Sequence, residues 1–209
     1  MRWVCFDVGE TLIDETRVWS TWADILRIPR FTFMAAFGAV IANAQDHRDV
    51  FGVFGVQDWQ SLEPQFQSAF GGFRSEDLYP DVVSALATLR DAGYRIAIIG
   101  NQPARRNAEL RAIGVEADLI AMSDELMVYK PSPEFFDRAL ELMAAAPSEV
   151  AYVGDRLDND VHPSSAAGMH AVWLMRGPWA RVTRDNPPPG TRAFGTLTEL
   201  AANVEHIWE

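Results

Sequence analysis

The chain has 209 residues, enough for one or two domains, and its 48% apolar content is sufficient for a core of ordinary size. Its 29 acidic residues outnumber 18 basic ones, and the net charge of −11 without a Lys/Arg-rich run disfavours nucleic acid or an anionic membrane as partner. Cys5 is the only cysteine, which excludes an intramolecular disulfide, and no signal-like segment follows Met1, so we expect a cytoplasmic protein. Composition leaves the oligomeric state open.

Strand-like and helix-like segments alternate over most of the chain. After a first strand that ends at Phe6, we predict strands at 94–99, 117–121, 150–153 and 171–174, and helices at 82–92, 104–113, 133–145, 162–167 and 197–207. Nearly continuous apolar strands separated by helices are typical of a parallel sheet covered on both faces. The predicted fold class is therefore α/β, with a Rossmann-like parallel sheet as its core.

The pattern changes between about Asp14 and Asp77, where aromatic residues recur at helical spacings without a convincing strand. We predict an inserted all-helical subdomain at residues 15–77, with the sheet core formed by residues 1–14 and 78–209. Its aromatic side chains are interpreted as a small packed core rather than as a wall of a substrate site. The longest apolar stretch, residues 31–44, is too short to span a bilayer and is interpreted as a buried amphipathic helix.

Charged residues follow the ends of the predicted strands. Asp7 comes directly after the first strand, and Asp155, Asp158 and Asp160 come directly after the strand at 150–153, while Lys130 lies in a loop beside two prolines. The carboxyl ends of parallel strands are where an open α/β sheet places its active site. A carboxylate nucleophile, a lysine and an acidic cluster at that edge predict metal-dependent phosphoryl transfer.

Four ordered segments resemble the haloacid dehalogenase-like hydrolase superfamily, and the resemblance covers the whole chain apart from the insertion. The segments are Asp7 with Thr11, the strand that leads to Asn101, Lys130-Pro131, and Gly154-Asp155 with Asp160. The resemblance implies that residues 15–77 form a helical cap that closes over the active site.

The same resemblance implies a Mg²⁺ ion and a role for each matching residue. The metal site would comprise the Asp7 carboxylate, the main-chain oxygen of Gly9, Asp155 and Asp160, with Asp160 orienting metal-bound water. Lys130 would neutralise Asp7 and the transferring phosphoryl oxygens as a compact positive charge. Asp158 is interpreted either as a second orienting group or as a solvated carboxylate.

Two positions depart from the family pattern. Gly9 stands where most phosphatases of the superfamily carry a second aspartate, which protonates the leaving alcohol. Glu10 is the nearest candidate for this catalytic role, although it is equally interpreted as a carboxylate that caps the following turn.

The second departure is Gly100, where the family usually places Ser or Thr to bind phosphate. Main-chain N–H groups remain at Gly100, and the amide of Asn101 either donates to phosphate or holds the loop. Thr11 completes the expected phosphate-binding set.

We therefore predict a Mg²⁺-dependent phosphohydrolase that acts on a small phosphorylated metabolite through an aspartyl-phosphate at Asp7. One alternative is a 2-haloacid dehalogenase, a branch that also lacks the second aspartate and needs no metal, but the acidic cluster argues against it. The other alternative is a catalytically weak protein that binds a phosphometabolite or a partner, which Gly9 and Gly100 motivate. The natural substrate is not determined by the sequence.

Overall fold

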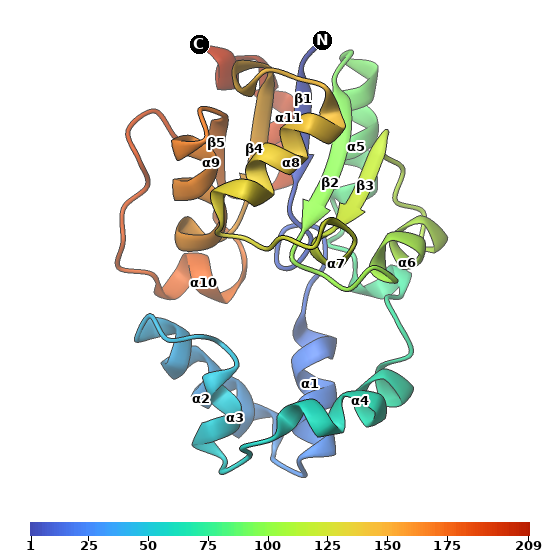
Figure 1. Cartoon of the computed structure of the whole chain (residues 1–209), viewed down its shortest axis with the longest axis vertical. Coiled ribbons are helices and arrows are strands. Elements are labelled where there is room, and N and C mark those ends of the chain that lie inside the picture. Colours follow the sequence, from blue (N-terminus) through green and yellow to red (C-terminus); the bar gives the residue numbers. More distant parts are fainter.

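A computed structural model describes all residues, 1–209, and contains one six-stranded sheet (Figure 1). The strands are β1 Trp3–Phe6, β2 Arg95–Gly100, β3 Leu119–Met122, β4 Val150–Gly154, β5 His170–Leu174 and β6 Arg192–Phe194. Every neighbouring pair is parallel, in the order β3-β2-β1-β4-β5-β6. The predicted α/β class is thus confirmed. The sequence did not predict β6, because three residues after a proline-rich segment give no strand pattern.

Helices cover both faces of the sheet, as the alternation of side chains along β1 shows. Val4 and Phe6 point into a core shared with α5, Val82–Asp91, whereas Trp3 and Cys5 point into a second core shared with α8, Pro133–Met143. Cys5 is fully buried, and burial raises the pKa of its thiol, so it acts as a small apolar residue.

The remaining helices of this part of the chain are short. They are α6 Arg106–Ala112, α7 Ser123–Leu126, α9 His162–Ala166, α10 Gly177–Val182 and α11 Leu197–Ala202. The helix predicted at 197–207 is divided after α11, and a 3₁₀ turn follows at Val204–Trp208. Asn203 explains the break, because its side-chain amide donates to the carbonyl of Glu199 at 2.8 Å and ends the helix there.

The segment between β1 and α5 contains helices and no strand. These helices are α1 Thr16–Ile25, α2 Arg30–Ala42, α3 Asp49–Val53 and α4 Glu63–Phe70, and they lie beyond the carboxyl ends of the strands (Figure 1). Aromatic side chains fill their interior, for example Trp22, which stacks on Phe66 with 4.5 Å between ring centroids. The helix predicted at 31–44 corresponds to α2 and buries Phe33 and Phe37. Phe31, near its start, is 87% exposed and is a surface residue.

The two chain segments that connect this helical insertion to the sheet are bonded to each other. Ile13 and Leu78 form an antiparallel bridge, and the N–H of Asp14 donates to the carbonyl of Asp77 at 2.8 Å. Arg17 on α1 adds an ion pair to the Asp77 carboxylate at 2.5 Å. These contacts fix the start of α1 close to the end of β1.

No single helix is long and apolar enough to cross a membrane. Only α1 and α2 taken together reach that length and composition, and they are bent by 115° relative to each other.

Candidate active site

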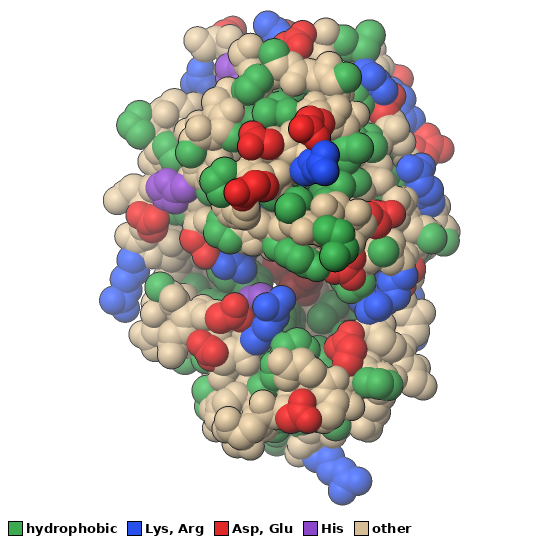
Figure 2. Space-filling view, in the orientation of Figure 1, with side chains coloured by type: hydrophobic (Ala, Val, Ile, Leu, Met, Phe, Trp, Pro, Cys, Tyr) green, Lys and Arg blue, Asp and Glu red, His purple; other side chains and the backbone are tan.

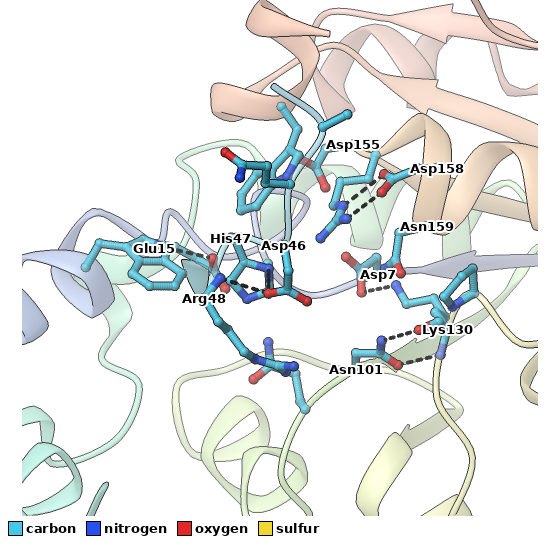
Figure 3. Close-up of a pocket in the computed structure, with 18 residues that line it drawn as sticks. Asp7, Glu15, Asp46, His47, Arg48, Asn101, Lys130, Asp155, Asp158 and Asn159 are labelled. Atoms are coloured by element: carbon cyan, nitrogen blue, oxygen red, sulfur yellow. Dashed lines mark hydrogen bonds and ion pairs between the residues drawn. The ribbon is translucent and has the colours of Figure 1, made fainter. Parts of the chain in front are cut away.

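A cavity of about 440 Å³ lies between the carboxyl edge of the sheet and the helical insertion. The edge contributes residues after three neighbouring strands, namely Asp7 after β1, Asn101 after β2 and Asp155 after β4. The insertion contributes Glu15 and the loop between α2 and α3, as Figure 3 shows. On the molecular face in Figure 2, a hollow separates the sheet core from the insertion. Sheet topology alone therefore brings the predicted charged residues together.

Lys130 is the centre of the charged cluster. Its side chain is fully buried, and Nζ lies 2.7 Å from Oδ1 of Asp7 and 2.6 Å from Oδ1 of Asp160. Burial alone would lower the pKa of Lys130, but the Asp160 and Asp7 carboxylates outweigh it and raise the pKa, so the ammonium stays charged. The chain has one lysine among its 18 cationic residues. A compact ammonium fits between two buried carboxylates, whereas a planar guanidinium needs more room.

Asn101 holds the loop that carries Lys130. Its amide Nδ2 donates to the carbonyl of Lys130 at 2.9 Å, and the N–H of Lys130 donates to Oδ1 of Asn101 at 2.8 Å. Of the two roles expected for this amide, the structure shows the loop-holding one, while the residue still lines the cavity.

Three carboxylates can hold a metal ion at the edge of the sheet. Asp7, Asp155 and Asp160 are all buried, and ligand atoms from the three lie within 4.8 Å of one another. Asp155 is 2% exposed, and its Oδ2 has no hydrogen-bond partner. Burial, followed by the charges of Asp160 and Asp7, raises the pKa of Asp155 well above its usual range. A divalent cation would supply the missing positive charge and partner, so the residues fit Mg²⁺.

Asp160 differs from the other two carboxylates because both of its oxygens already have partners. Oδ1 accepts from Lys130, and Oδ2 accepts the N–H of Arg156 at 3.0 Å. Burial raises the pKa of Asp160 to about 6, although Lys130 opposes the shift. Asp160 lies in a π-helical turn, Leu157–Val161, and its side chain packs against Gly154 at the end of β4. Its visible role is to hold Lys130 in place.

Gly100 is required by close packing of the nucleophile. A Cβ on Gly100 would lie 2.5 Å from Oδ1 of Asp7 and 3.1 Å from the Val8 side chain. A serine or threonine at this position is therefore incompatible with the present placement of Asp7. The departure of this chain from the family pattern at Gly100 has a steric reason.

The structure does not bring Glu10 or Thr11 to the cavity. Glu10 has a left-handed backbone (φ 50°), and its carboxylate accepts the hydroxyl of Tyr79 at 2.5 Å and the N–H of Glu15 at 2.9 Å. Both oxygens thus have partners outside this cavity, and the bond to the N–H of Glu15 is the turn-capping contact of the alternative interpretation of Glu10. Thr11 is fully buried, and its hydroxyl has no partner and does not line the cavity.

Glu15 is the carboxylate that the sequence prediction missed. It lines the cavity together with Asp7 and Gly9, and its Oε2 accepts the indole N–H of Trp19 at 3.2 Å. Burial, with smaller contributions from Glu10 and Asp7, raises the pKa of Glu15 to about 8. Glu15 lies eight residues beyond Asp7, at the start of α1, and no local pattern in the sequence indicates that the chain returns to the site there.

The loop between α2 and α3 covers the cavity with Asp46, His47 and Arg48. Burial lowers the pKa of His47 to about 4, so its imidazole is neutral near pH 7. Across the cavity, Arg156 pairs with Asp158 at 2.6 Å, so Asp158 is an ion-pair partner there. This loop was also missed, because its place depends on how the insertion packs against the sheet.

Comparison with known proteins adds family information to this geometry. A model of haloacid dehalogenase-like hydrolases matches residues 1–168. A glyceraldehyde 3-phosphate phosphatase of Methanopyrus kandleri is 34% identical over 102 residues, which are 47% of this chain and 44% of that protein. An (S)-2-haloacid dehalogenase 4A of Burkholderia cepacia is 26% identical over 73% of this chain and 62% of that protein. The chain thus spans less than two thirds of the length of each of these two relatives.

The crystal structure of a HAD phosphatase from Thermococcus onnurineus superposes with a TM-score of 0.62. It is 25% identical in sequence, and the match covers 98% of each chain. The arrangement of sheet and helical insertion is thus shared over the full chain.

Proposed function

Because this chain belongs to the haloacid dehalogenase-like hydrolase family, we propose that it is a Mg²⁺-dependent phosphohydrolase acting through an aspartyl-phosphate on Asp7. The observation that carries the proposal is the buried cluster at the sheet edge, in which one lysine faces two aspartates and Asp155 keeps an unpartnered oxygen. This arrangement suits a divalent metal ion, because three buried carboxylates face one ammonium, and the added positive charge would allow an anionic substrate to bind beside Asp7.

We assign the nucleophile, the lysine and the metal site to a catalytic core of residues 1–14 and 78–209, and the cap role to residues 15–77. The cavity lies where these two parts meet and takes lining residues from both. The paired connecting segments at Ile13 and Leu78 give the insertion a narrow attachment to the sheet. A cap that rests on such an attachment can close over substrate and exclude water.

Asp7, Asp155 and the main-chain oxygen of Gly9 would hold Mg²⁺, with Asp160 supporting the site through Lys130. When bound, the ion supplies positive charge against the phosphoryl oxygens and the buried carboxylates. Asp7 attacks phosphorus, and Lys130 steadies its carboxylate at 2.7 Å and neutralises charge on the transferring group. Asn101 keeps the Lys130 loop in register with the end of β2.

The substrate we propose is a small phosphorylated metabolite. A cavity of about 440 Å³ has the size of a small-molecule site, and most of its lining side chains are polar. Arg48 from the insertion and Arg156 from the sheet core both line it and would bind polar groups beyond the phosphate. The net charge of −11 and the buried, lone Cys5 agree with a small-molecule hydrolase of the cytoplasm.

A dehalogenase is the second candidate, favoured by Gly9 and by the relative that is named as one. A metal-free reaction at carbon gives no reason to bury Asp155 beside Asp7 and Asp160 with one oxygen unpartnered. A phosphometabolite-binding protein without turnover would also use this cluster, and only a rate measurement distinguishes it.

The test is release of nitrophenol from p-nitrophenyl phosphate, whose good leaving group needs little acid catalysis. We expect turnover with Mg²⁺, loss of turnover with chelator, and loss in Asp7→Asn. Asp91→Asn, at an exposed carboxylate that ends α5, is the matched control and should behave as wild type. Halide release from a 2-haloacid that is indifferent to chelator would favour the dehalogenase, and ligand-dependent stabilisation without turnover would favour the binding protein.

A further inference from the structure

The candidate site lacks a proton donor two residues after the nucleophile, because Gly9 has no side chain. Departure of an alcohol from phosphorus without a proton is slow, and general acid catalysis typically contributes about 10²–10⁴ in rate. The carboxylate of Glu10 faces Tyr79 outside the cavity and does not fill this role.

Glu15 occupies the space that a side chain at position 9 would take. A Cβ built on Gly9 would lie 2.5 Å from Oε1 and 3.0 Å from Cδ of Glu15, closer than side-chain atoms approach. Gly9 and Glu15 are therefore complementary, since the missing side chain of one makes room for the carboxyl group of the other. Figure 3 shows Glu15 reaching the same cavity as Asp7 from the side of the insertion.

Neighbouring residues fix the orientation of the Glu15 carboxyl group. Trp19 donates its indole N–H to Oε2 at 3.2 Å, while Oε1 beside Gly9 accepts no hydrogen bond from the protein. The backbone N–H of Glu15 is held by Oε1 of Glu10 at 2.9 Å, and Glu10 is itself held by Tyr79. Glu10 is thus a positioning residue, which places Glu15 at the first turn of α1.

We propose that Glu15 is the general acid and base of the reaction, in place of the side chain absent at position 9. The inference rests on the proposed phosphohydrolase function. In the first step, the bond from Asp7 to phosphorus forms, the ester P–O bond breaks, and Glu15 gives its proton to the leaving oxygen. In the second step, Glu15 takes a proton from the attacking water as the bond between Asp7 and phosphorus breaks, which restores both carboxyl groups and releases phosphate.

The test compares two esters of nearly the same size in Glu15→Gln, namely p-nitrophenyl phosphate and phenyl phosphate. The measurement is the rate of phenol or nitrophenol release in the first turnover, with Mg²⁺ present. We expect the phenyl ester, which has the poorer leaving group, to slow by about 10²-fold, and the nitrophenyl ester by less than about 10-fold. Steady-state turnover of both should fall further, because the second step also uses Glu15.

Glu76→Gln is the matched control, since Glu76 is an exposed carboxylate of the same insertion and lies outside the cavity. It should leave both first-turnover rates as in wild type. Equal slowing of the two esters in Glu15→Gln, or no slowing, would overturn the assignment, because a merely structural role affects both leaving groups alike.

A second variant moves the acid back to position 9. In Glu15→Ala the space beside Gly9 is free for a new side chain. The double variant Gly9→Asp/Glu15→Ala should therefore release phenol from phenyl phosphate at least about 10-fold faster than Glu15→Ala alone. Gly9→Asp alone should not accelerate the reaction, because the new side chain meets the Glu15 carboxyl group. A double variant as slow as Glu15→Ala, with its melting temperature preserved, would contradict the claim that Glu15 replaces an acid at position 9.

The outcomes also separate this inference from the function on which it rests. Wild type that turns over neither ester overturns the phosphohydrolase proposal and this assignment together. Wild type that turns over both esters through Asp7, with Glu15→Gln equally active, overturns the assignment alone.

Discussion

The carboxyl edge of the sheet and the helical insertion line the same cavity by different physical means. At the edge, Lys130, Asp155 and Asp160 are buried, and their positions follow from which strands are neighbours. In the insertion, packed aromatic side chains form the core, and Asp46 and Arg48 are exposed on the loop between α2 and α3. The edge thus fixes the charged cluster around Lys130, whereas the loop between α2 and α3 presents exposed side chains to the cavity. We therefore expect substitutions in the charged cluster, or at Glu15, to affect bond cleavage, and substitutions in the loop between α2 and α3 to affect substrate choice.

The largest effect should follow removal of the single lysine. Lys130→Met takes the positive charge from two buried aspartates, so we expect first-turnover rates to fall by at least about 10³-fold. The free energy of unfolding should fall by about 3–5 kcal/mol, because the carboxylates are left buried and uncompensated. Urea denaturation and rapid-quench kinetics measure the two effects.

Arg138→Met is the control for this change, since it also introduces methionine in place of a cation, but at an exposed position on α8. It should change the free energy of unfolding by less than about 0.5 kcal/mol. Activity of Lys130→Met within 10-fold of wild type would show that the charge at the sheet edge is not needed for the reaction.

The next effect should separate stability from chemistry. Trp22→Ala opens a cavity in the aromatic core of the insertion, where Trp22 is 5% exposed and stacks on Phe66. We expect a loss of about 3–5 kcal/mol in the free energy of unfolding. First-turnover nitrophenol release, measured where the variant is folded, should stay within about 10-fold of wild type, because Trp22 does not line the cavity.

Phe31→Ala makes the same kind of truncation at a side chain that is 87% exposed in the same region. Its free energy of unfolding should change by less than about 0.5 kcal/mol. A large fall in nitrophenol release in Trp22→Ala would mean that the aromatic core of the insertion is needed for the chemistry as well as for stability.

Strand ends account for what the sequence could predict of the site. Asp7, Lys130 and Asp155 were found because each lies beside the end of a recognisable strand or in a distinctive loop, and parallel strands end at one edge. Glu15 could not be found, because its approach to Gly9 depends on the packing of α1 against the sheet. Glu10 was the nearest candidate in sequence, with a turn-capping role as the equal alternative, and its positive φ and the Tyr79 hydroxyl hold its carboxylate outside this cavity.

In the fold, too, the elements with a local sequence pattern were predicted and those that depend on distant contacts were not. Five strands and the helices between them follow from continuous apolar segments bounded by glycine and proline. Strand β6 and the short helix α10 have no such pattern, since the sheet and the insertion supply their partners. Side-chain placement in the loop between α2 and α3 likewise depends on contacts across the cavity.

The smallest predicted effect is a dependence of stability on pH in the presence of chelator. The pKa of Glu15 is raised to about 8 and that of Asp155 is also raised, so the folded state binds these protons more tightly than the unfolded state. Their contribution to stability is complete below the ordinary carboxyl pKa and is lost as the pH rises through the folded-state pKa. Between pH 6.5 and 8 we expect the free energy of unfolding to fall by on the order of 1 kcal/mol.

His47 does not contribute to this change between pH 6.5 and 8. Its pKa is lowered to about 4, so it affects stability only between that value and its ordinary pKa of 6.5. Saturating Mg²⁺ should raise the melting temperature and reduce the fall by the part that Asp155 contributes, since the ion neutralises the carboxylates at the sheet edge. Stability that rises from pH 6.5 to 8 in chelator would contradict the raised carboxyl pKa values.

The central claim is that Asp7 becomes covalently phosphorylated, and the most direct measurement is an acid quench during turnover of p-nitrophenyl phosphate with Mg²⁺. Peptide mass spectrometry should then find one phosphoryl group on the peptide that contains Asp7, absent with chelator and absent in Asp7→Asn. Sustained turnover without a phosphoryl group on Asp7, or turnover that persists in Asp7→Asn, would contradict the account.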